Sequence, residues 1–153
     1  MLHLGSVYLI VRDFQKSIAF YTALLQMQPT GINRERWAQY DFEGHCIALF
    51  NIDYDVRRVA ENRELQGHYS QSYLEWLKNT PITYGNQAVL NFWIEDLNAE
   101  IARLQSIGIA PVSPVKYVNI AMPYWMVTLN DPDGNLIEIT GRYTQKDEEN
   151  SCR

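Results

Sequence analysis

The sequence predicts an α+β protein of two tandem βαβββ modules, which form a cup-shaped mixed sheet with the helices on its outer face. The first observation behind this prediction is a repeat. A β-rich run closed by an aspartate occurs at 7–13 (VYLIVRD) and again at 90–96 (LNFWIED). The second observation is that each run precedes one helical pattern and then three strand-like segments. Each half therefore has the same predicted order of elements.

The two helices are predicted by an apolar stripe that begins directly after each aspartate. Four positions recur 83 residues later: Phe14, Ile18, Tyr21 and Leu25 become Leu97, Ile101, Leu104 and Gly108. The spacing i, i+4, i+7 places such residues on one helix face. Asp13 and Asp96 are suitable N-caps, because a carboxylate accepts the free amide hydrogens of the first turn. Gly108 is suited to end the second helix in a left-handed conformation.

Three strand-like segments follow each helix. They are 28–33, 36–42 and 45–51 in the first half, and 115–120, 123–130 and 135–141 in the second. The last two strands meet at a strong turn, 131–135 (DPDGN), in which Pro132 presets φ and Gly134 supplies a positive φ.

The segment at 52–86 breaks the repeat. Ile52, Val56 and Val59 lie at helical spacing, and a second helix is predicted from 70 to 78, before Pro81. We interpret this insert either as a linker packed on the outside or as a lid or dimer element over a cleft. The expected organisation is a single domain at 1–143, with modules at 1–51 and 87–143 around the insert, and a disordered polar tail at 144–153.

Strand alternation separates an apolar face from a mixed one. The apolar face is expected under the helices and carries Val7, Leu9, Val11, Ile47, Leu49, Leu90, Phe92, Ile94, Ile137 and Ile139. The other face mixes aromatic residues with isolated polar groups, as ligand-binding surfaces do. The ligand-binding residues predicted on it are Ser6, Tyr8, Trp37, Gln39, Phe50, Asn91, Trp93, Tyr124, Met126 and Glu138. The alternative is that this face packs on a partner chain.

The repeated runs, together with the following helix sequences and NDPDGNLIEI at 130–139, resemble the vicinal-oxygen-chelate superfamily. This superfamily groups glyoxalase I, extradiol dioxygenases, antibiotic-modifying enzymes and bleomycin-resistance proteins. Phe20-Tyr21 followed by Leu24-Leu25 is similar to the family's FY..LLG stretch, with Gln26 in place of the usual glycine. The resemblance implies a cup of paired modules, often completed at a dimer interface. Many members hold a divalent metal there.

The resemblance also implies four metal-ligand positions, on the first and last strand of each module. They correspond to Ser6, Ala48, Val89 and Glu138. Only Glu138 is a good ligand, because valine and alanine offer no lone pair and a serine hydroxyl binds transition metals poorly. We therefore predict no metal and no cofactor. The alternative is a divalent metal such as Zn, Ni or Fe in a rearranged site.

Glu138 is the best candidate for a catalytic residue. Its carboxylate in an aromatic cup would receive a cationic or hydroxyl-bearing ligand or act as a base. Alternatively it is structural and pairs with an arginine or lysine near a dimer seam. Cys46 and Ser6 lack a histidine of matching parity, so the sequence does not support a nucleophilic mechanism.

Composition narrows the partners and the compartment. The net charge of −5 argues against nucleic acid or an acidic membrane as partner. No apolar run is long enough to span a membrane or to serve as a signal peptide. The only cysteines, Cys46 and Cys152, are far apart in sequence, which fits a reducing cytoplasm.

The leading functional hypothesis is a glyoxalase/bleomycin-resistance-like homodimer that binds a small aromatic or amphipathic molecule in a cleft without a metal. One alternative is a metal-dependent glyoxalase I-type lyase or dioxygenase. Another is a non-catalytic regulatory or interaction module. The residues leave open the identity of the ligand, whether a reaction is catalysed, and whether modules pair within one chain or between two.

Overall fold

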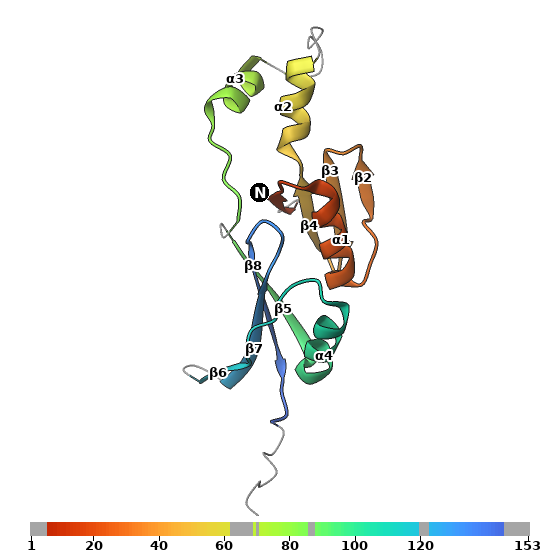
Figure 1. Ribbon diagram of the computed structural model, residues 1–153, viewed down its shortest axis with the longest axis vertical. Coiled ribbons are helices and arrows are strands. Elements are labelled where there is room, and N and C mark those ends of the chain that lie inside the picture. Colours follow the sequence, from red (N-terminus) through yellow and green to blue (C-terminus); the bar gives the residue numbers. More distant parts are fainter. Residues whose placement is uncertain (1–5, 62–68, 70, 86–87, 120–122, 146–153) are drawn as a thin grey trace, which may run out of the picture. The chain divides into compact units, whose positions relative to one another are not determined.

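The computed structural model describes residues 6–61, 69, 71–85, 88–119 and 123–145 (Figure 1). The chain divides into two compact units, Met1–Gly85 with Pro132–Gly134 and Asn86–Asp131 with Asn135–Arg153. Each unit contains one four-stranded mixed sheet with the same connectivity. The predicted α+β class and the two tandem βαβββ modules are therefore confirmed.

The first unit contains the first module and the insert. The module consists of β1 (Val7–Ile10), α1 (Phe14–Leu25), β2 (Gly31–Asn33), β3 (Trp37–Phe42) and β4 (His45–Phe50). Its strand order is β1-β4-β3-β2, and only the β1–β4 pair is parallel. The insert forms the two predicted helices, α2 (Ile52–Glu61) and α3 (Gln71–Asn79). β2 begins later than predicted, after Pro29, which has no N–H to donate to a sheet.

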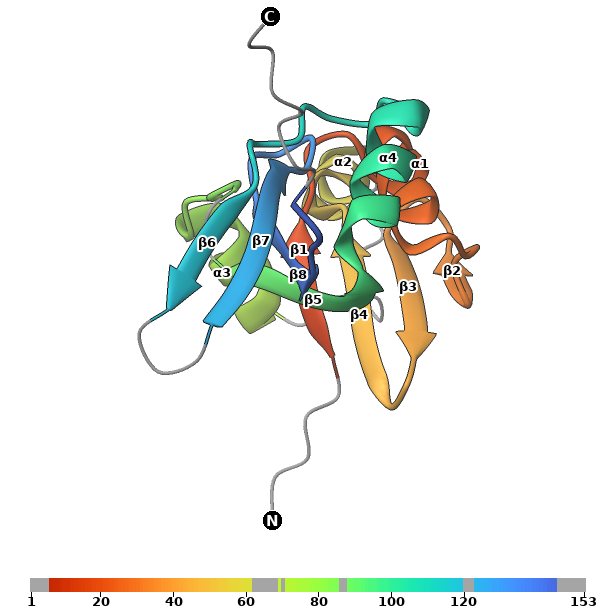
Figure 2. The same ribbon diagram turned by 90° about the horizontal axis from the view of Figure 1, so that it is seen from below.

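The second unit repeats this arrangement. It consists of β5 (Val89–Asp96), α4 (Leu97–Ile107), β6 (Lys116–Asn119), β7 (Pro123–Asn130) and β8 (Leu136–Arg142). The strand order is β5-β8-β7-β6, again with the first and last strands parallel. β6 and β7 lie side by side at one edge of this sheet (Figure 2).

The ends of α1 and α4 follow the predicted capping chemistry. The Asp13 carboxylate accepts the Lys16 N–H at 3.0 Å, and Asp96 accepts the Ala99 N–H at the same distance. Gly108 adopts φ 61° after α4, and its N–H donates to the Leu104 carbonyl at 3.0 Å. The corresponding left-handed residue after α1 is Gln26, with φ 55°. The 83-residue spacing pairs Gly108 with Leu25. Because α4 is one residue shorter than α1, however, Gly108 corresponds in structure to Gln26.

The buried face of α1 is rotated relative to the predicted stripe. Its buried residues are Phe14, Ser17, Phe20, Tyr21 and Leu24, whereas Ile18 and Leu25 are half-buried. In α4, the buried residues are Leu97 and Leu104. The sequence predicts the correct helix, but the buried face of that helix is centred slightly to one side of the predicted apolar stripe. The apolar stripe could not include Ser17, which is buried despite its polar hydroxyl.

The apolar face of each sheet packs beneath its helix. α1 contacts β4, and α4 contacts β5, β7 and β8. Most predicted core positions are buried, namely Leu9, Val11, Ile47, Leu49, Leu90, Ile137 and Ile139. Val7, Phe92 and Ile94 are more exposed, and Val7 begins its strand. None of the described helices is long and apolar enough to cross a membrane.

Candidate ligand-binding site

The register of the first sheet places four predicted ligand residues on one face. Tyr8 and Gln39 are both paired with Ala48, while Trp37 is paired with Phe50. Directly paired residues on neighbouring strands point to the same side of a sheet. The alternation of β1, β3 and β4 therefore puts these side chains opposite the helix α1, as predicted.

Three aromatic rings form a cluster on this face. The Tyr8 ring centroid lies 5.5 Å from that of Trp37 and 6.0 Å from that of Phe50, and the Trp37 and Phe50 centroids lie 6.4 Å apart. The indole N–H of Trp37 donates to Gln39 Oε1 at 3.0 Å, and Gln39 Nε2 donates to Asp41 at 2.8 Å. Gln39 thus orients the Trp37 ring. Its amide oxygen and its amide nitrogen both form hydrogen bonds to side chains of the same strand.

A cavity of about 210 Å³ opens beside this cluster. It is lined by Tyr8, Arg36, Trp37, Phe50, Tyr73 and Trp76. The last two residues belong to α3, so the insert contributes one wall of the cavity. Trp76 extends the α3 aromatic surface, with its ring centroid 5.4 Å from that of Tyr73.

A buried carboxylate connects this wall to the sheet. Asp55, on α2, has no exposed surface. It accepts hydrogen bonds from the Tyr73 hydroxyl at 2.6 Å and the Tyr69 hydroxyl at 2.9 Å. It also accepts from Arg36 Nε, at 2.8 Å to Oδ1 and 3.1 Å to Oδ2. Asp55 therefore links α2, α3 and the start of β3.

The ionisation states within this group follow from burial and hydrogen bonding. Burial alone would raise the pKa of Asp55, but the hydrogen bonds from Arg36, Tyr73 and Tyr69 outweigh it and hold that pKa below its ordinary value. Burial, followed by the bond to Asp55, raises the pKa of Tyr73 to about 12. At neutral pH, Asp55 is therefore an anion that accepts hydrogen bonds from protonated tyrosines.

Arg36 is the cationic group of the cavity. Its hydrogen bond to Asp55 raises the pKa of the guanidinium above its ordinary value, against the effect of burial. The guanidinium carbon lies 4.8 Å from the centroid of the Phe50 ring, in cation–π geometry. The arginine is thereby held between a carboxylate and an aromatic face.

The predicted ligand residues of the second module share a face of the other sheet. Asn91 pairs with Glu138, and Met126 pairs with Thr140 beside Trp93. Asn91 Nδ2 donates to Glu138 Oε1 at 2.8 Å. Trp93 is 64% exposed and Tyr124 is 38% exposed. Ser6, the remaining predicted residue, lies half-buried directly before β1.

The structure thus brings together Tyr8, Trp37 and Phe50 at one cavity, with Gln39 behind them. Asn91, Trp93, Tyr124, Met126 and Glu138 form a separate group on the second sheet. Sequence reasoning named neither Arg36 nor Asp55 as a site residue. The burial of Asp55 could have been predicted from the sequence, because this residue lies three positions after Ile52 on the apolar side of α2.

The residues at the four implied metal positions do not fit a divalent metal. Tyr8 pairs with Ala48 as Asn91 pairs with Glu138, so Ala48 and Glu138 are equivalent positions in the two sheets. Ala48 is fully buried and presents only a methyl group, and Val89 presents only an alkyl side chain. Among the described residues, no group of three or more His, Cys, Asp or Glu could hold a metal ion.

Cys46, also on the mixed face, is a poor nucleophile. Burial and a hydrogen bond with Asp41 raise the pKa of its thiol to about 11. A thiol with such a pKa is almost entirely protonated at neutral pH, and only the thiolate is reactive. This chemistry agrees with the lack of sequence support for a cysteine mechanism.

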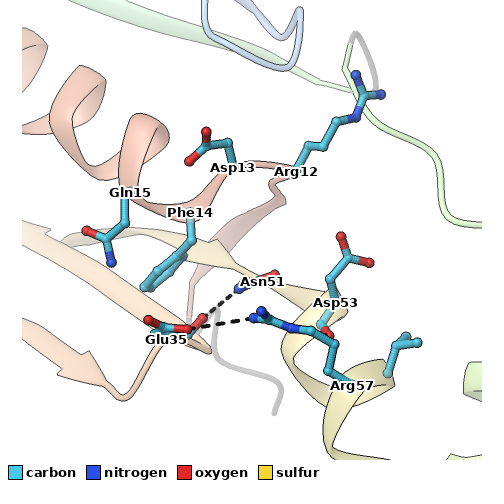
Figure 3. A pocket seen from close by; sticks show the side chains of 9 residues that line it. Arg12, Asp13, Phe14, Gln15, Glu35, Asn51, Asp53 and Arg57 are labelled. Atoms are coloured by element: carbon cyan, nitrogen blue, oxygen red, sulfur yellow. Dashed lines mark hydrogen bonds and ion pairs between the residues drawn. The ribbon is translucent and has the colours of Figure 1, made fainter. Parts of the chain in front are cut away.

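A second, larger hollow in the first unit is lined mainly by polar and charged residues (Figure 3). Its volume is about 680 Å³, and its lining includes Arg12, Asp13, Glu35, Asp53 and Arg57. Arg57 forms an ion pair with Glu35 at 3.7 Å, and Asp13 caps α1. This hollow contains charges of both signs and only two apolar side chains, Phe14 and Val56. The aromatic cavity is therefore the stronger candidate for ligand binding.

Comparison with known proteins identifies the family. The model of the Glyoxalase/Bleomycin resistance protein/Dioxygenase superfamily matches residues 2–139. The chain belongs to this superfamily. No curated protein matches the chain significantly.

Solved structures share the superfamily fold across nearly the whole chain. A glyoxalase-related enzyme from Fulvimarina pelagi has a TM-score of 0.62 at 14% identity, covering 93% of this chain and 89% of that one. A lactoylglutathione lyase from Agrobacterium tumefaciens has a TM-score of 0.60 at 14% identity, covering 91% and 92%. A protein from the mobile metagenome of V. pseudocholerae has a TM-score of 0.62 at 22% identity, covering 94% and 97%. At such identities these likenesses show the fold alone.

Proposed function

We propose that this superfamily member binds a small aromatic or amphipathic molecule, without a metal, in the cavity between the first sheet and α3. The observation that carries the proposal is the convergence of five aromatic side chains and one arginine on that cavity. Aromatic walls supply apolar contact area, and a single polar group fixes the orientation of the ligand.

The size of the cavity limits the ligand. A volume of about 210 Å³ is below the roughly 300–1,000 Å³ typical of drug-sized sites, whereas a cavity of roughly 150 Å³ holds benzene. We therefore expect a compound of one or two rings, or the aromatic end of a longer amphipathic molecule. Offset or edge-to-face contacts with the lining rings contribute about 0.5–1.5 kcal/mol each beyond the burial of apolar area.

The donor set supports binding without a metal. Three of the four implied ligand positions are serine, alanine and valine, and the remaining Glu138 accepts a hydrogen bond from Asn91. The same chemistry weakens the alternative of a metal-dependent lyase or dioxygenase, which needs several good ligands at one site. The homodimer and the cytoplasmic location stay predictions, and sedimentation analysis would check the first.

Thermal-shift measurements with one- and two-ring aromatic compounds test the proposal. Compounds that bind only the folded state raise Tm in a concentration-dependent way. We expect Trp76→Ala, which removes part of the α3 wall of the cavity, to weaken binding at least fivefold. Trp93→Ala, which removes an exposed indole from the second sheet, serves as the comparison and should leave the affinity within twofold.

Two results would contradict the proposal. One is a larger loss of affinity in Trp93→Ala than in Trp76→Ala, which would move the site to the second sheet. The other is binding that vanishes after treatment with a chelator and returns on addition of Zn²⁺ or Ni²⁺. Elemental analysis of the purified protein accompanies the second measurement.

A further inference from the structure

We infer that the ligand carries an anionic group, such as a carboxylate, beside its aromatic ring, and that Arg36 selects for it. This inference rests on the proposed function, because it concerns the same cavity. Neither the family match nor the fold by itself indicates an anionic ligand.

The exposure of the Arg36–Asp55 pair decides which charge a ligand meets. The Arg36 side chain is 34% exposed, whereas the Asp55 side chain is fully buried. The arginine also lines the cavity, and the aspartate does not. A ligand in the cavity therefore meets the cation directly, while the compensating anion lies behind it.

An aromatic cavity ordinarily favours cations, because the face of a ring attracts positive charge. Here Arg36 already lies over the Phe50 ring, with its guanidinium carbon 4.8 Å from the centroid. An ammonium group on the ligand would have to approach this fixed guanidinium, and like charges at close range in a partly buried site repel each other. The cavity is therefore suited to anions despite its aromatic walls.

Asp55 positions the arginine for this task. The ion pair engages Nε, with oxygen distances of 2.8 and 3.1 Å, so the plane of the guanidinium is held in one orientation. A guanidinium carries five N–H donors, and its planar fork matches the geometry of a carboxylate. A hydrogen bond between two charged groups is roughly twice as strong as one between neutral groups.

Titration calorimetry with three probes of one ring system tests the inference. The probes are 2-naphthoate, 2-naphthalenemethanol and 2-naphthylmethylammonium, which differ in the charge of one substituent. We expect 2-naphthoate to bind at least tenfold more tightly than the alcohol, and the ammonium to bind more weakly than the alcohol. An alcohol or ammonium that binds as tightly as 2-naphthoate would overturn the inference and leave the proposed function intact. If no probe binds, the proposed function itself fails.

Substitutions test whether Arg36 causes the preference for 2-naphthoate over the alcohol. Arg36→Gln combined with Asp55→Asn removes both charges together, so that no buried charge loses its partner. We expect the preference for 2-naphthoate over the alcohol to fall to within threefold, while binding of the alcohol persists. Arg57→Gln, which removes an exposed positive charge elsewhere in the same unit, should keep the full preference. A preference that survives in the folded double variant would overturn the role of Arg36, and if that variant does not fold, Arg36→Lys must reduce the preference.

Discussion

At the residue scale, a single buried aspartate organises the candidate site. Asp55 accepts hydrogen bonds from Arg36, Tyr69 and Tyr73, which come from three different segments of the first unit. A buried carboxylate without such partners would be strongly destabilising. The aromatic wall on α3 therefore depends on a residue that has no contact with the ligand cavity.

We expect Asp55→Ala to reduce the free energy of unfolding by about 2–4 kcal/mol. The substitution leaves the Arg36 cation and two tyrosine hydroxyls without their shared acceptor, and removing one member of a buried ion pair costs about 3–5 kcal/mol. The expected loss is smaller because Arg36 is partly exposed. Urea denaturation measures the change. Asp53→Ala on the same helix is the control and should stay within about 0.5 kcal/mol; equal effects of the two would contradict the account.

The pKa of Tyr73 predicts a loss of stability in alkali. Its folded-state pKa is raised from 10.0 to about 12 by burial and by the bond to Asp55. The unfolded chain thus releases this proton first, so the stabilisation is complete below pH 10 and is lost as pH rises towards 12. Denaturation midpoints measured between neutral and strongly alkaline pH should fall less steeply in Tyr73→Phe than in wild type. Tyr117→Phe, in the other unit, should retain the wild-type slope, and identical slopes in all three proteins would refute this assignment.

At the element scale, the duplicated helices end in the same backbone conformation with different residues. Gln26 and Gly108 both have positive φ, at 55° and 61°. Glycine adopts this region without the steric penalty that a Cβ introduces. The family's FY..LLG pattern has glycine at the position of Gln26, so the first module retains the conformation without the favoured residue.

A matched pair of substitutions tests this difference. Gln26→Gly should raise the free energy of unfolding by about 0.5–1 kcal/mol, and Gly108→Gln should lower it by a similar amount. Thermal denaturation of both variants measures the two shifts. The account predicts opposite signs, and a destabilised Gln26→Gly protein would show that the Gln26 side chain makes a compensating contact.

The same scale shows why some elements could be predicted from the sequence and others could not. Caps such as Asp13 and Asp96, and turn residues such as Gly134, act on the neighbouring backbone. The local sequence is therefore enough to predict their effect. The mixed face of the first sheet was also predictable, because strand parity determines it. The position of α3 was not, because it depends on hydrogen bonds from Tyr69 and Tyr73 to Asp55, which lies 14 and 18 residues earlier in the sequence. Without that contact, neither Trp76 nor Arg36 could be assigned to the cavity.

At the scale of the whole molecule, the two modules have the same topology but different surface chemistry. The equivalent pairs Tyr8–Ala48 and Asn91–Glu138 illustrate the divergence, since one is aromatic and apolar and the other is a hydrogen-bonded polar pair. The family resemblance implies metal ligands on these strands. Here the aromatic face of the first module and helix α3 of the insert instead line one cavity. This cavity is the proposed binding site.

The most direct test of this account is NMR chemical-shift mapping of chelator-treated protein titrated with 2-naphthoate. We predict saturable shifts concentrated at the residues around the cavity, namely Tyr8, Arg36, Trp37, Phe50, Tyr73 and Trp76. We also predict that these shifts are the same before and after addition of a divalent metal. Shifts concentrated instead at Asn91, Trp93 and Glu138, or shifts that appear only when metal is added, would contradict it.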